Sequence, residues 1–215
     1  MNTLKNIGFT IALLFVASCV FGQETQENPK RIISLSMYKS IMYYGGNTSS
    51  ASVISLGNFT PAVAWGMEND DFHEIEVTKL NFSSRNSSFN LGLGVNYTYN
   101  WKVIEAKSST YNFYVGTGIN PSFSTSHNTS TVSTNFPYSN TSVGVNLSIV
   151  PLFRWNVSDK FFLNFSAPYR YYNYSYNYSN NENPATPLEQ RKQIINSSKI
   201  FPNDFTVRVG IGIKF

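Results

Sequence analysis

Apolar and polar side chains alternate along most of the chain after residue 30. Over 88–103, every odd-numbered position from Phe89 to Val103 is aliphatic or aromatic, whereas the even-numbered positions are Ser, Asn, Gly, Thr or Lys. The last segment, 204–215, alternates in the same way up to Phe215. Successive side chains of a strand point to opposite faces, so a period of two predicts strands rather than helices.

Segments with this alternation predict eight strands, of which the first three are the least regular. Lys39 falls on the apolar face of the first, and Pro61 interrupts the second. The third loses phase between Val77 and Leu80, which predicts a β-bulge. The predicted strands are 31–43, 52–66, 72–82, 88–103, 110–123, 142–155, 160–174 and 204–215.

The polar face of these strands indicates which medium the apolar face meets. Over 88–101 the polar face has no charged residue. Small uncharged side chains suit the interior of a narrow barrel, whereas a continuous aliphatic and aromatic face suits lipid. Most of the segments exceed the roughly 9 to 11 residues that a strand needs to cross a bilayer. The sequence therefore predicts an all-β fold, an eight-stranded antiparallel up-and-down transmembrane β-barrel.

The connections alternate in length. Those at 67–71, 105–109 and 156–159 are short, whereas those at about 124–141 and 175–203 are long. Transmembrane barrels have short periplasmic turns and longer extracellular loops, so both termini are predicted in the periplasm and the two long loops outside.

Aromatic residues gather near both predicted membrane interfaces. Trp65, Trp101 and Trp155 immediately precede the short turns and predict an inner girdle. An outer girdle is predicted from Tyr43, Tyr44, Tyr169, Tyr171, Tyr172 and Tyr174. Lys39 is expected near the outer interface, where its aliphatic stem lets the charge reach water.

The first 22 residues have the features of a secretory signal peptide. Lys5 precedes an apolar stretch at 7–16, and Val20 and Gly22 are the small residues of a cleavage site after Gly22. A second interpretation is that the segment ending in Cys19 is a lipobox and that this cysteine is lipidated. The polar stretch 23–30 is predicted to be a flexible periplasmic leader, and 31–215 to be the barrel.

Charge and cysteine content exclude some functions. The net charge of +4 is mild and scattered, so no nucleic-acid partner is expected. The single cysteine, Cys19, lies in the predicted signal peptide, which leaves the mature chain without disulfides if cleavage follows Gly22. His73 and His127 are predicted at opposite ends of the barrel, which argues against a metal site or an acid–base pair. No catalytic residue, metal ligand or cofactor is predicted.

Ionisable residues on the inward faces are candidates for an interior site. Because a buried charge needs a partner, Glu–Arg bridges are expected inside the barrel. Such bridges are compatible with a gate in a narrow conduit, or with a core that is filled because inward glycines leave room for long side chains. The predicted interior charges are Glu74, Glu76, Lys102, Arg154, Arg170, Arg208 and Lys214.

Two further features fall in or near the last long connection. Tyrosines crowd 171–178 and predict either a binding surface or a continued aromatic girdle. Thr186 and Glu189 have the spacing of a capping box, with Pro187 at the first helical position, so one or two helical turns are expected over 187–195.

Two signatures in the last third of the chain resemble those of a known group. The terminal Phe215, with apolar residues at every second position before it, resembles the signal that the barrel-assembly machinery reads. The segment 151–161, PLFRWNVSDKF, resembles the strand–turn–strand signature of small outer-membrane β-barrel domain proteins, which have the OmpA/OmpX-type eight-stranded architecture. The resemblance implies a monomer in the outer membrane of a Gram-negative cell envelope, with membrane lipid and the assembly machinery as partners.

The function predicted from the sequence is structural: the barrel is an anchor and the long loops bind an extracellular ligand. A small channel or porin-like permeation protein is an alternative, as are a lipid-modifying enzyme and a secretion or assembly factor. An enzyme is not expected, because the chain lacks the local motif of a lipid A deacylase.

Overall fold

The computed structural model describes residues 32–44, 52–53, 59–66, 70–85, 88–105, 110–129 and 136–215. The predicted signal peptide at 1–22 and leader at 23–30 lie outside these residues. Within the described ranges, no helix combines the length and the hydropathy needed to cross a bilayer. The elements in chain order are β1 (Ile33–Tyr44), β2 (Ser52–Val53), β3 (Thr60–Gly66), β4 (Phe72–Arg85), β5 (Ser88–Glu105), β6 (Tyr111–Asn128), β7 (Tyr138–Asn156), β8 (Phe161–Ser166), β9 (Tyr169–Asn181), α2 (Leu188–Arg191) and β10 (Lys192–Lys214).

The sheet closes on itself. Each strand pairs antiparallel with its neighbour, and β10 returns to β1 with Ser34 opposite Lys214. β8 and β9 both lie between β7 and β10 and form one strand, which is interrupted at Pro168 because proline has no N–H to donate. The short β2 pairs only with the end of β1. The described strands thus form the eight-stranded barrel that the sequence predicts.

Burial alternates along the strands with the apolar side chains outside. In β6, Asn112, Tyr114 and Gly116 are buried, whereas Phe113 and Val115 are exposed. The outward face therefore carries most of the exposed large hydrophobic residues, and the inward face carries most of the buried polar ones. This is the arrangement of a barrel that has lipid around it.

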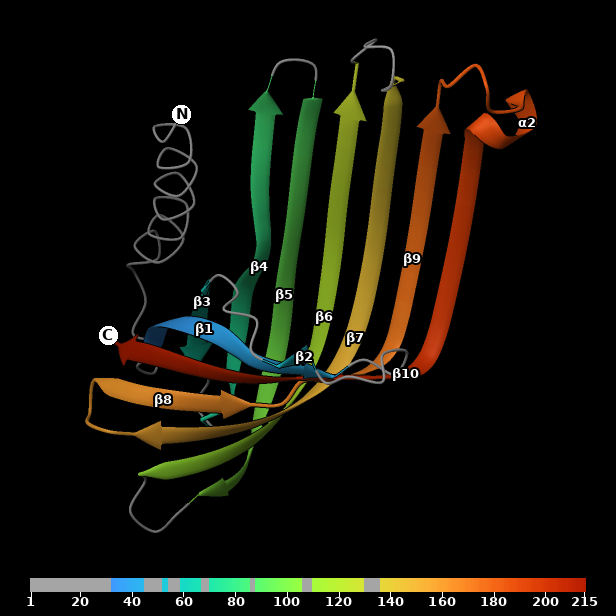
Figure 1. Cartoon of the computed structure of the whole chain (residues 1–215). Helices are drawn as coiled ribbons and strands as arrows, with labels where there is room; N and C mark the ends of the chain where they lie inside the picture. The colour runs from blue at the N-terminus through green and yellow to red at the C-terminus, as the bar shows by residue number, and fades with distance from the viewer. Residues whose placement is uncertain are drawn as a thin grey trace, which may run out of the picture.

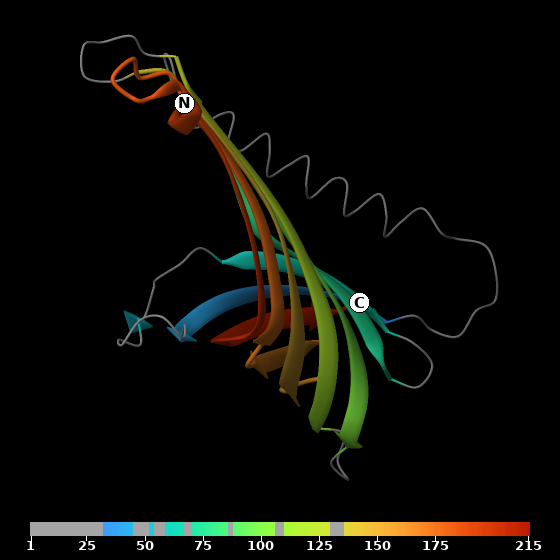
Figure 2. The same ribbon diagram turned by 90° about the vertical axis from the view of Figure 1, so that its right-hand side faces the viewer.

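Six strands continue beyond the closed barrel on one side and form an open sheet, which we call the wall (Figure 1). Among the described residues, the barrel is closed where β1 and β3 contribute: β1 pairs with β10 up to Phe205, and β3 pairs with β4 up to Glu76. Seen from the side, the wall is a single curved layer that rises from the barrel (Figure 2). The wall consists of 77–85 of β4, 88–95 of β5, 120–128 of β6, 138–146 of β7, 173–181 of β9 and 192–199 of β10.

The wall corrects the prediction of two long loops. Much of the segment 124–141 is strand, because β6 extends to Asn128 and β7 begins at Tyr138. The segment 175–203 is also mostly strand, divided between β9 and β10. The hydrophobic alternation fades at the tips of β6 and β7, where Ser, Thr and Asn occupy both faces, and in β10, where Ile194 and Ile195 are adjacent, although the backbone pairing continues.

Two local predictions can also be compared with the structure. The predicted bulge is confirmed by a register shift between Val77 and Lys79. The predicted helix over 187–195 is wrong in length: α2 is a four-residue helix, and Lys192 already has extended backbone angles. Its N-terminal residue is capped by no side chain, so the capping-box pattern does not form. The β-forming run QII after Lys192 pairs with β9 instead.

Candidate functional site

A polar network crosses the lumen of the barrel at the level where β1 and β3 close it. The Tyr38 hydroxyl of β1 donates to Glu74 Oε2 of β4 at 2.7 Å and accepts from Asn164 Nδ2 of β8 at 2.7 Å. Arg154 Nε of β7 donates to Asn164 Oδ1 at 2.9 Å. Tyr38 and Asn164 are completely buried. This chain of contacts joins four strands through the interior.

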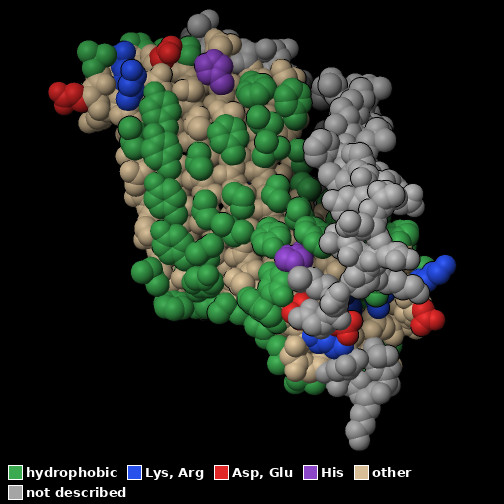
Figure 3. Space-filling model, turned by 180° about the vertical axis from the view of Figure 1, so that it is seen from behind, with side chains coloured by type: hydrophobic (Ala, Val, Ile, Leu, Met, Phe, Trp, Pro, Cys, Tyr) green, Lys and Arg blue, Asp and Glu red, His purple; other side chains and the backbone are tan. Residues whose placement is uncertain are grey.

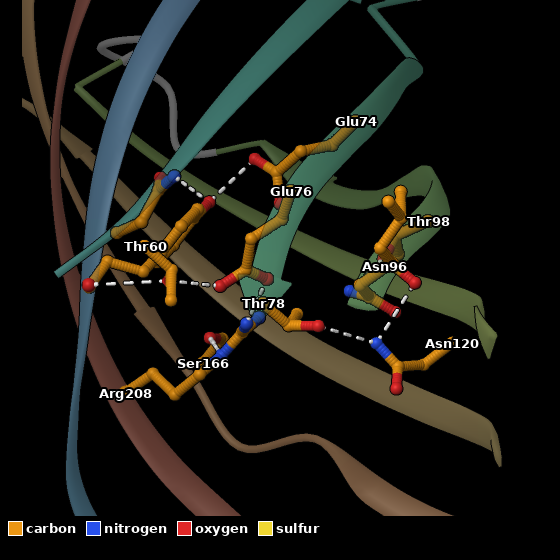
Figure 4. Close-up of polar contacts among 12 residues, drawn as sticks. Thr60, Glu74, Glu76, Thr78, Asn96, Thr98, Asn120, Ser166 and Arg208 are labelled. Atoms are coloured by element: carbon orange, nitrogen blue, oxygen red, sulfur yellow. Dashed lines mark hydrogen bonds and ion pairs between the residues drawn. The ribbon is translucent and has the colours of Figure 1, made fainter. Parts of the chain in front are cut away.

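A second set of contacts surrounds Glu76, which is almost completely buried. Its carboxylate accepts from Thr60 of β3 and forms an ion pair with Arg208 of β10 (Figure 4). Arg208 Nε also donates to Ser166 Oγ at 3.3 Å, and its guanidinium lies 4.8 Å from the Tyr38 ring centroid. The interior thus holds a Glu–Arg bridge whose members come from strands that are not neighbours.

Aromatic rings complete the packing around Arg154. Its guanidinium lies 4.3 Å from the ring centroids of both Phe72 and Phe162, and Phe162 is completely buried. Such cation–π contacts stabilise a desolvated arginine. Together with the two polar sets, these rings occupy the cross-section of the lumen.

Glycines on β10 make this packing possible. A Cβ atom on Gly210 would lie 2.6 Å from two ring atoms of Tyr38, and one on Gly212 would overlap the Phe162 ring. The two rings therefore rest against bare backbone. The inward glycines provide room for large side chains rather than an open path.

The other predicted interior charges lie nearer the two ends. Lys102 forms an ion pair with Asp70 at 2.7 Å at the short-turn end, and Lys214 Nζ donates to Asn156 Oδ1 at 2.8 Å. Arg170 lies at the base of the wall, 3.4 Å from Asp204, with both side chains partly exposed. Of the seven predicted residues, Glu74, Glu76, Arg154 and Arg208 are brought together at the network, whereas these three are not.

The interior residues that sequence reasoning missed are the uncharged ones. Tyr38, Thr60 and Asn164 contact the buried charges but carry none. The sequence does indicate that Tyr38 points inward, because Tyr38 lies on the same face of β1 as the buried Ser34 and Ser36. A tyrosine on a face of serines indicates an inward ring with a hydroxyl that needs a partner.

The predicted girdle residues lie on the strands as follows. Trp65, Trp101 and Trp155 stand on the outer face near the short turns, where Trp101 packs on Tyr99 and Trp65 stacks on His73. Tyr169 pairs with Ile149 on the outer face of β9, and Tyr171 falls at the register shift beside it. Tyr43 lies opposite Thr206 of β10. Phe215 follows β10, and its N–H bonds to Ile33 O at 2.8 Å.

The two histidines are far apart along the strands. His73 lies opposite Tyr99 near the short turns and forms a 2.7 Å hydrogen bond with the Tyr97 hydroxyl. His127 lies near the tip of β6, opposite Phe89. The structure does not bring them together into one site.

The inward face of the wall is uncharged and polar at its centre; we call it the polar face. Register pairing places only Ser, Asn and Gly on it between positions 120–128 of β6, 140–146 of β7 and 173–181 of β9. Near its base, Asn120 Nδ2 donates to Thr78 Oγ1 at 3.1 Å (Figure 4), and Asn146 Nδ2 donates to Asn120 Oδ1 at 3.4 Å. Asn173 donates to Asn146 in turn. A row of amides thus crosses the wall where it leaves the barrel.

The outer face of the wall continues the apolar surface of the barrel before it becomes polar. On β7 the outward residues from Trp155 to Val143 are all apolar or aromatic, and Thr141 and Ser139 follow them. Viewed from behind, rows of hydrophobic side chains cover this face of the wall (Figure 3).

A hollow of about 450 Å³ lies at the tip of the wall, between the end of the β6–β7 hairpin and the β9–β10 hairpin. Tyr138, Asn140 and Ser179 line it from the polar face, and Gln190 and Arg191 line it from α2. The backbone ties the two hairpins together, because Glu182 N–H donates to Pro137 O at 3.0 Å. The hollow could not be predicted from the sequence, because its lining comes from two segments that were expected to be loops.

The pairing, the outward apolar face and the filled polar lumen define the class: an up-and-down transmembrane β-barrel with a wall extending from one end. No protein-family model matches the chain, and no curated protein matches it.

Three of the similar solved structures are outer membrane proteins of low sequence identity. A major outer membrane protein from Thermus thermophilus has 9% identity and a TM-score of 0.49, covering 87% of this chain and 100% of that one. Ail, the attachment invasion locus protein of Yersinia pestis, has 10% identity and a TM-score of 0.38, covering 86% of this chain and 96% of that one. Neisserial surface protein A has 12% identity and a TM-score of 0.35, with coverage of 86% and 96%. At these values, the assignment to the class depends on the strand pairing and burial of the chain itself.

Proposed function

We propose that this chain is a bacterial outer-membrane protein with a non-catalytic, surface-interaction role. The barrel is the anchor, and the tips of the wall are the binding surface. The orientation is inferred from the short turns, which lie in the periplasm in transmembrane barrels, and export is expected from the predicted signal peptide at 1–22. The predicted role of Phe215 in recognition by the assembly machinery belongs to the same proposal.

One observation carries the proposal: β6 and β7 extend beyond the apolar part of their outer face, which ends at Phe123 and Val143. From Trp155 to Val143 is 12 residues along β7. At about 3.4 Å per residue and a tilt of about 40°, this spans roughly 30 Å, close to the hydrocarbon thickness of a bilayer. The tips of the hairpins, together with α2 and the hollow, lie beyond that band. A paired sheet gives these tips a fixed position that a loop would lack.

A small channel is the second candidate, and the packing of the lumen opposes it. Tyr38, Arg208 and Phe162 occupy the space in the lumen that the inward glycines leave. We expect the purified protein to give no steady single-channel openings in planar bilayers. Discrete openings that Gly118→Leu abolishes would favour the channel instead, because Gly118 faces inward within the closed barrel, where its added Cβ would meet Ser148 Oγ at 2.8 Å.

Labelling of cysteine variants on intact cells tests the location and orientation. In a Cys19→Ser background, Asn183→Cys places a thiol at the tip of the wall, and Ser158→Cys places one in the turn between β7 and β8. A membrane-impermeant maleimide should label the first variant on intact cells and the second only after the outer membrane is permeabilised. Labelling of Ser158→Cys alone on intact cells would contradict the proposed orientation.

A further inference from the structure

The hollow at the tip of the wall is lined almost entirely by uncharged polar and aromatic side chains. Phe136 and Tyr138 contribute aromatic rings, and Tyr138 is 45% exposed. Most of the other lining residues carry amides or hydroxyls; they include Asn140, Asn181 and Gln193. Among the described residues that line the hollow, none has a carboxylate, and Arg191 alone is charged.

Arg191 already has a structural role. Its Nε donates to Thr186 O at 3.0 Å, and one terminal nitrogen donates to Pro184 O at 3.2 Å. These bonds hold the turn before α2 against the helix. Two nitrogens of its guanidinium are therefore engaged with backbone carbonyls of its own loop, and the rest of the lining offers uncharged hydrogen-bonding groups.

The loop that forms the floor of the hollow is held in one conformation. Asn181 Oδ1 accepts from Asn183 N–H at 3.0 Å, and Asn183 Oδ1 accepts from Ala185 N–H at 2.8 Å. Gln193 Nε2 donates to Gln190 O at 3.3 Å across the junction of α2 with β10. A site that is ordered before binding loses less conformational entropy when a ligand enters it.

We propose that this hollow binds an uncharged sugar chain. Amides and hydroxyls both donate and accept, as sugar hydroxyls do, and an exposed tyrosine ring can cover the C–H face of a sugar ring. A volume of about 450 Å³ accommodates one or two sugar residues. This inference rests on the proposed function and names the class of ligand for the same surface.

The polar face extends the site below the hollow. Asn140 and Ser179, which line the hollow, belong to the same rows as Ser142 and Asn177, the next inward residues along β7 and β9. The central rows of β6, β7 and β9 carry no charge, and the inward residues Lys79 and Lys199 lie on the flanking strands β4 and β10, so the centre of the polar face offers a polyanion no ion pair. The absence of an apolar centre disfavours a protein partner. A longer glycan that enters the hollow would thus continue along the polar face.

The test is ligand binding by the whole protein, refolded in an amine-oxide detergent. Maltoside and glucoside detergents must be avoided because their head groups are themselves sugars. Chitotriose and maltotriose serve as neutral probes and sialyllactose as an acidic probe, with binding followed by saturation-transfer NMR. We expect saturable binding of at least one neutral probe, with little dependence on salt concentration.

Variants locate the site. Tyr138→Ala should weaken binding at least tenfold, whereas Tyr174→Ala, which removes a similarly exposed ring from the outer face, should change it less than twofold. If Tyr138→Ala does not fold, the wild-type amide signals of Tyr138 and Asn140 provide the same test, since the probe should shift them.

Three outcomes overturn the inference: no saturable binding of either neutral probe, binding of the acidic probe alone with steep salt dependence, and equal binding by both tyrosine variants. None of these affects the maleimide result on intact cells, so failure of the sugar site and failure of the proposed function are distinguishable.

Discussion

The ion pair between Arg208 and Glu76 joins β10 to β4 through the lumen, with each side chain almost completely buried. Removing one member leaves the other as an unpaired charge inside the barrel. Arg208→Met is therefore expected to lower the free energy of unfolding by about 3–5 kcal/mol. Urea unfolding in detergent micelles, followed by tryptophan fluorescence, measures this change.

Two further variants serve as controls for this measurement. Arg170→Met breaks a partly exposed pair with Asp204 and should cost about 1 kcal/mol or less. The double variant Glu76→Leu/Arg208→Met should recover part of the loss, because no charge then stays unpaired. Equal losses for Arg208→Met and Arg170→Met would mean that the buried pair contributes no more than a surface one.

A second residue-scale prediction concerns Gly210, which lies against the Tyr38 ring. Tyr38 is held by hydrogen bonds to Glu74 and Asn164, so it cannot move away without breaking them. Gly210→Ala is expected to destabilise the barrel by about 1–3 kcal/mol.

The matched control for Gly210 is Gly66→Ala. The nearest atom to its added Cβ is Ile32 O at an ordinary 3.6 Å, so this change should be neutral or slightly stabilising. The same unfolding assay compares the two variants, and a Gly210→Ala protein as stable as Gly66→Ala would argue against the packing described for the lumen.

At the scale of the elements, sequence patterns identify a strand wherever one face of it meets lipid. The segments 88–103 and 142–155 lie within β5 and β7, because their aliphatic faces are unbroken. The same reasoning fails at the tips of β6 and β7, where Ser, Thr and Asn on both faces give no hydrophobic periodicity. Strand pairing there depends on contacts between hairpins, which no single segment reveals.

The candidate site likewise has one part that the sequence predicts and one part that it does not. Inward and outward positions alternate along each strand, and this alternation places four charged residues on inward faces: Glu74, Glu76, Arg154 and Arg208. Because a buried charge needs a partner, ion pairs or hydrogen bonds are expected for them. The hollow depends instead on where the loop before α2 meets the end of the β6–β7 hairpin, which is a property of tertiary structure. Sequence therefore predicts the charges inside the lumen but not the hollow at the tip of the wall.

Backbone hydrogen exchange tests the wall as an element. If 139–146 and 174–180 are interior strands of a sheet, their amides should exchange far more slowly than those of the turn at 182–187. The measurement is made by NMR or mass spectrometry on the refolded protein. Exchange in the two strand segments as rapid as in the turn would restore the interpretation of these regions as loops.

At the scale of the whole molecule, the two faces of every strand have one orientation: the aliphatic and aromatic face points outward to lipid, and the Asn, Ser and Gly face points into the barrel. The filled lumen and the position of the polar tips all follow from this direction. A barrel of opposite sense would have an apolar core and would need no membrane.

A nitroxide scan along β5 tests this direction most directly. Single cysteines at 93–98 in a Cys19→Ser background are spin-labelled, and the protein is reconstituted in lipid vesicles. Labels at Leu93, Val95 and Tyr97 should collide readily with oxygen, which dissolves in lipid, whereas labels at Gly94, Asn96 and Thr98 should collide with it rarely. Oxygen accessibility with the opposite phase, or with no period of two, would contradict the account.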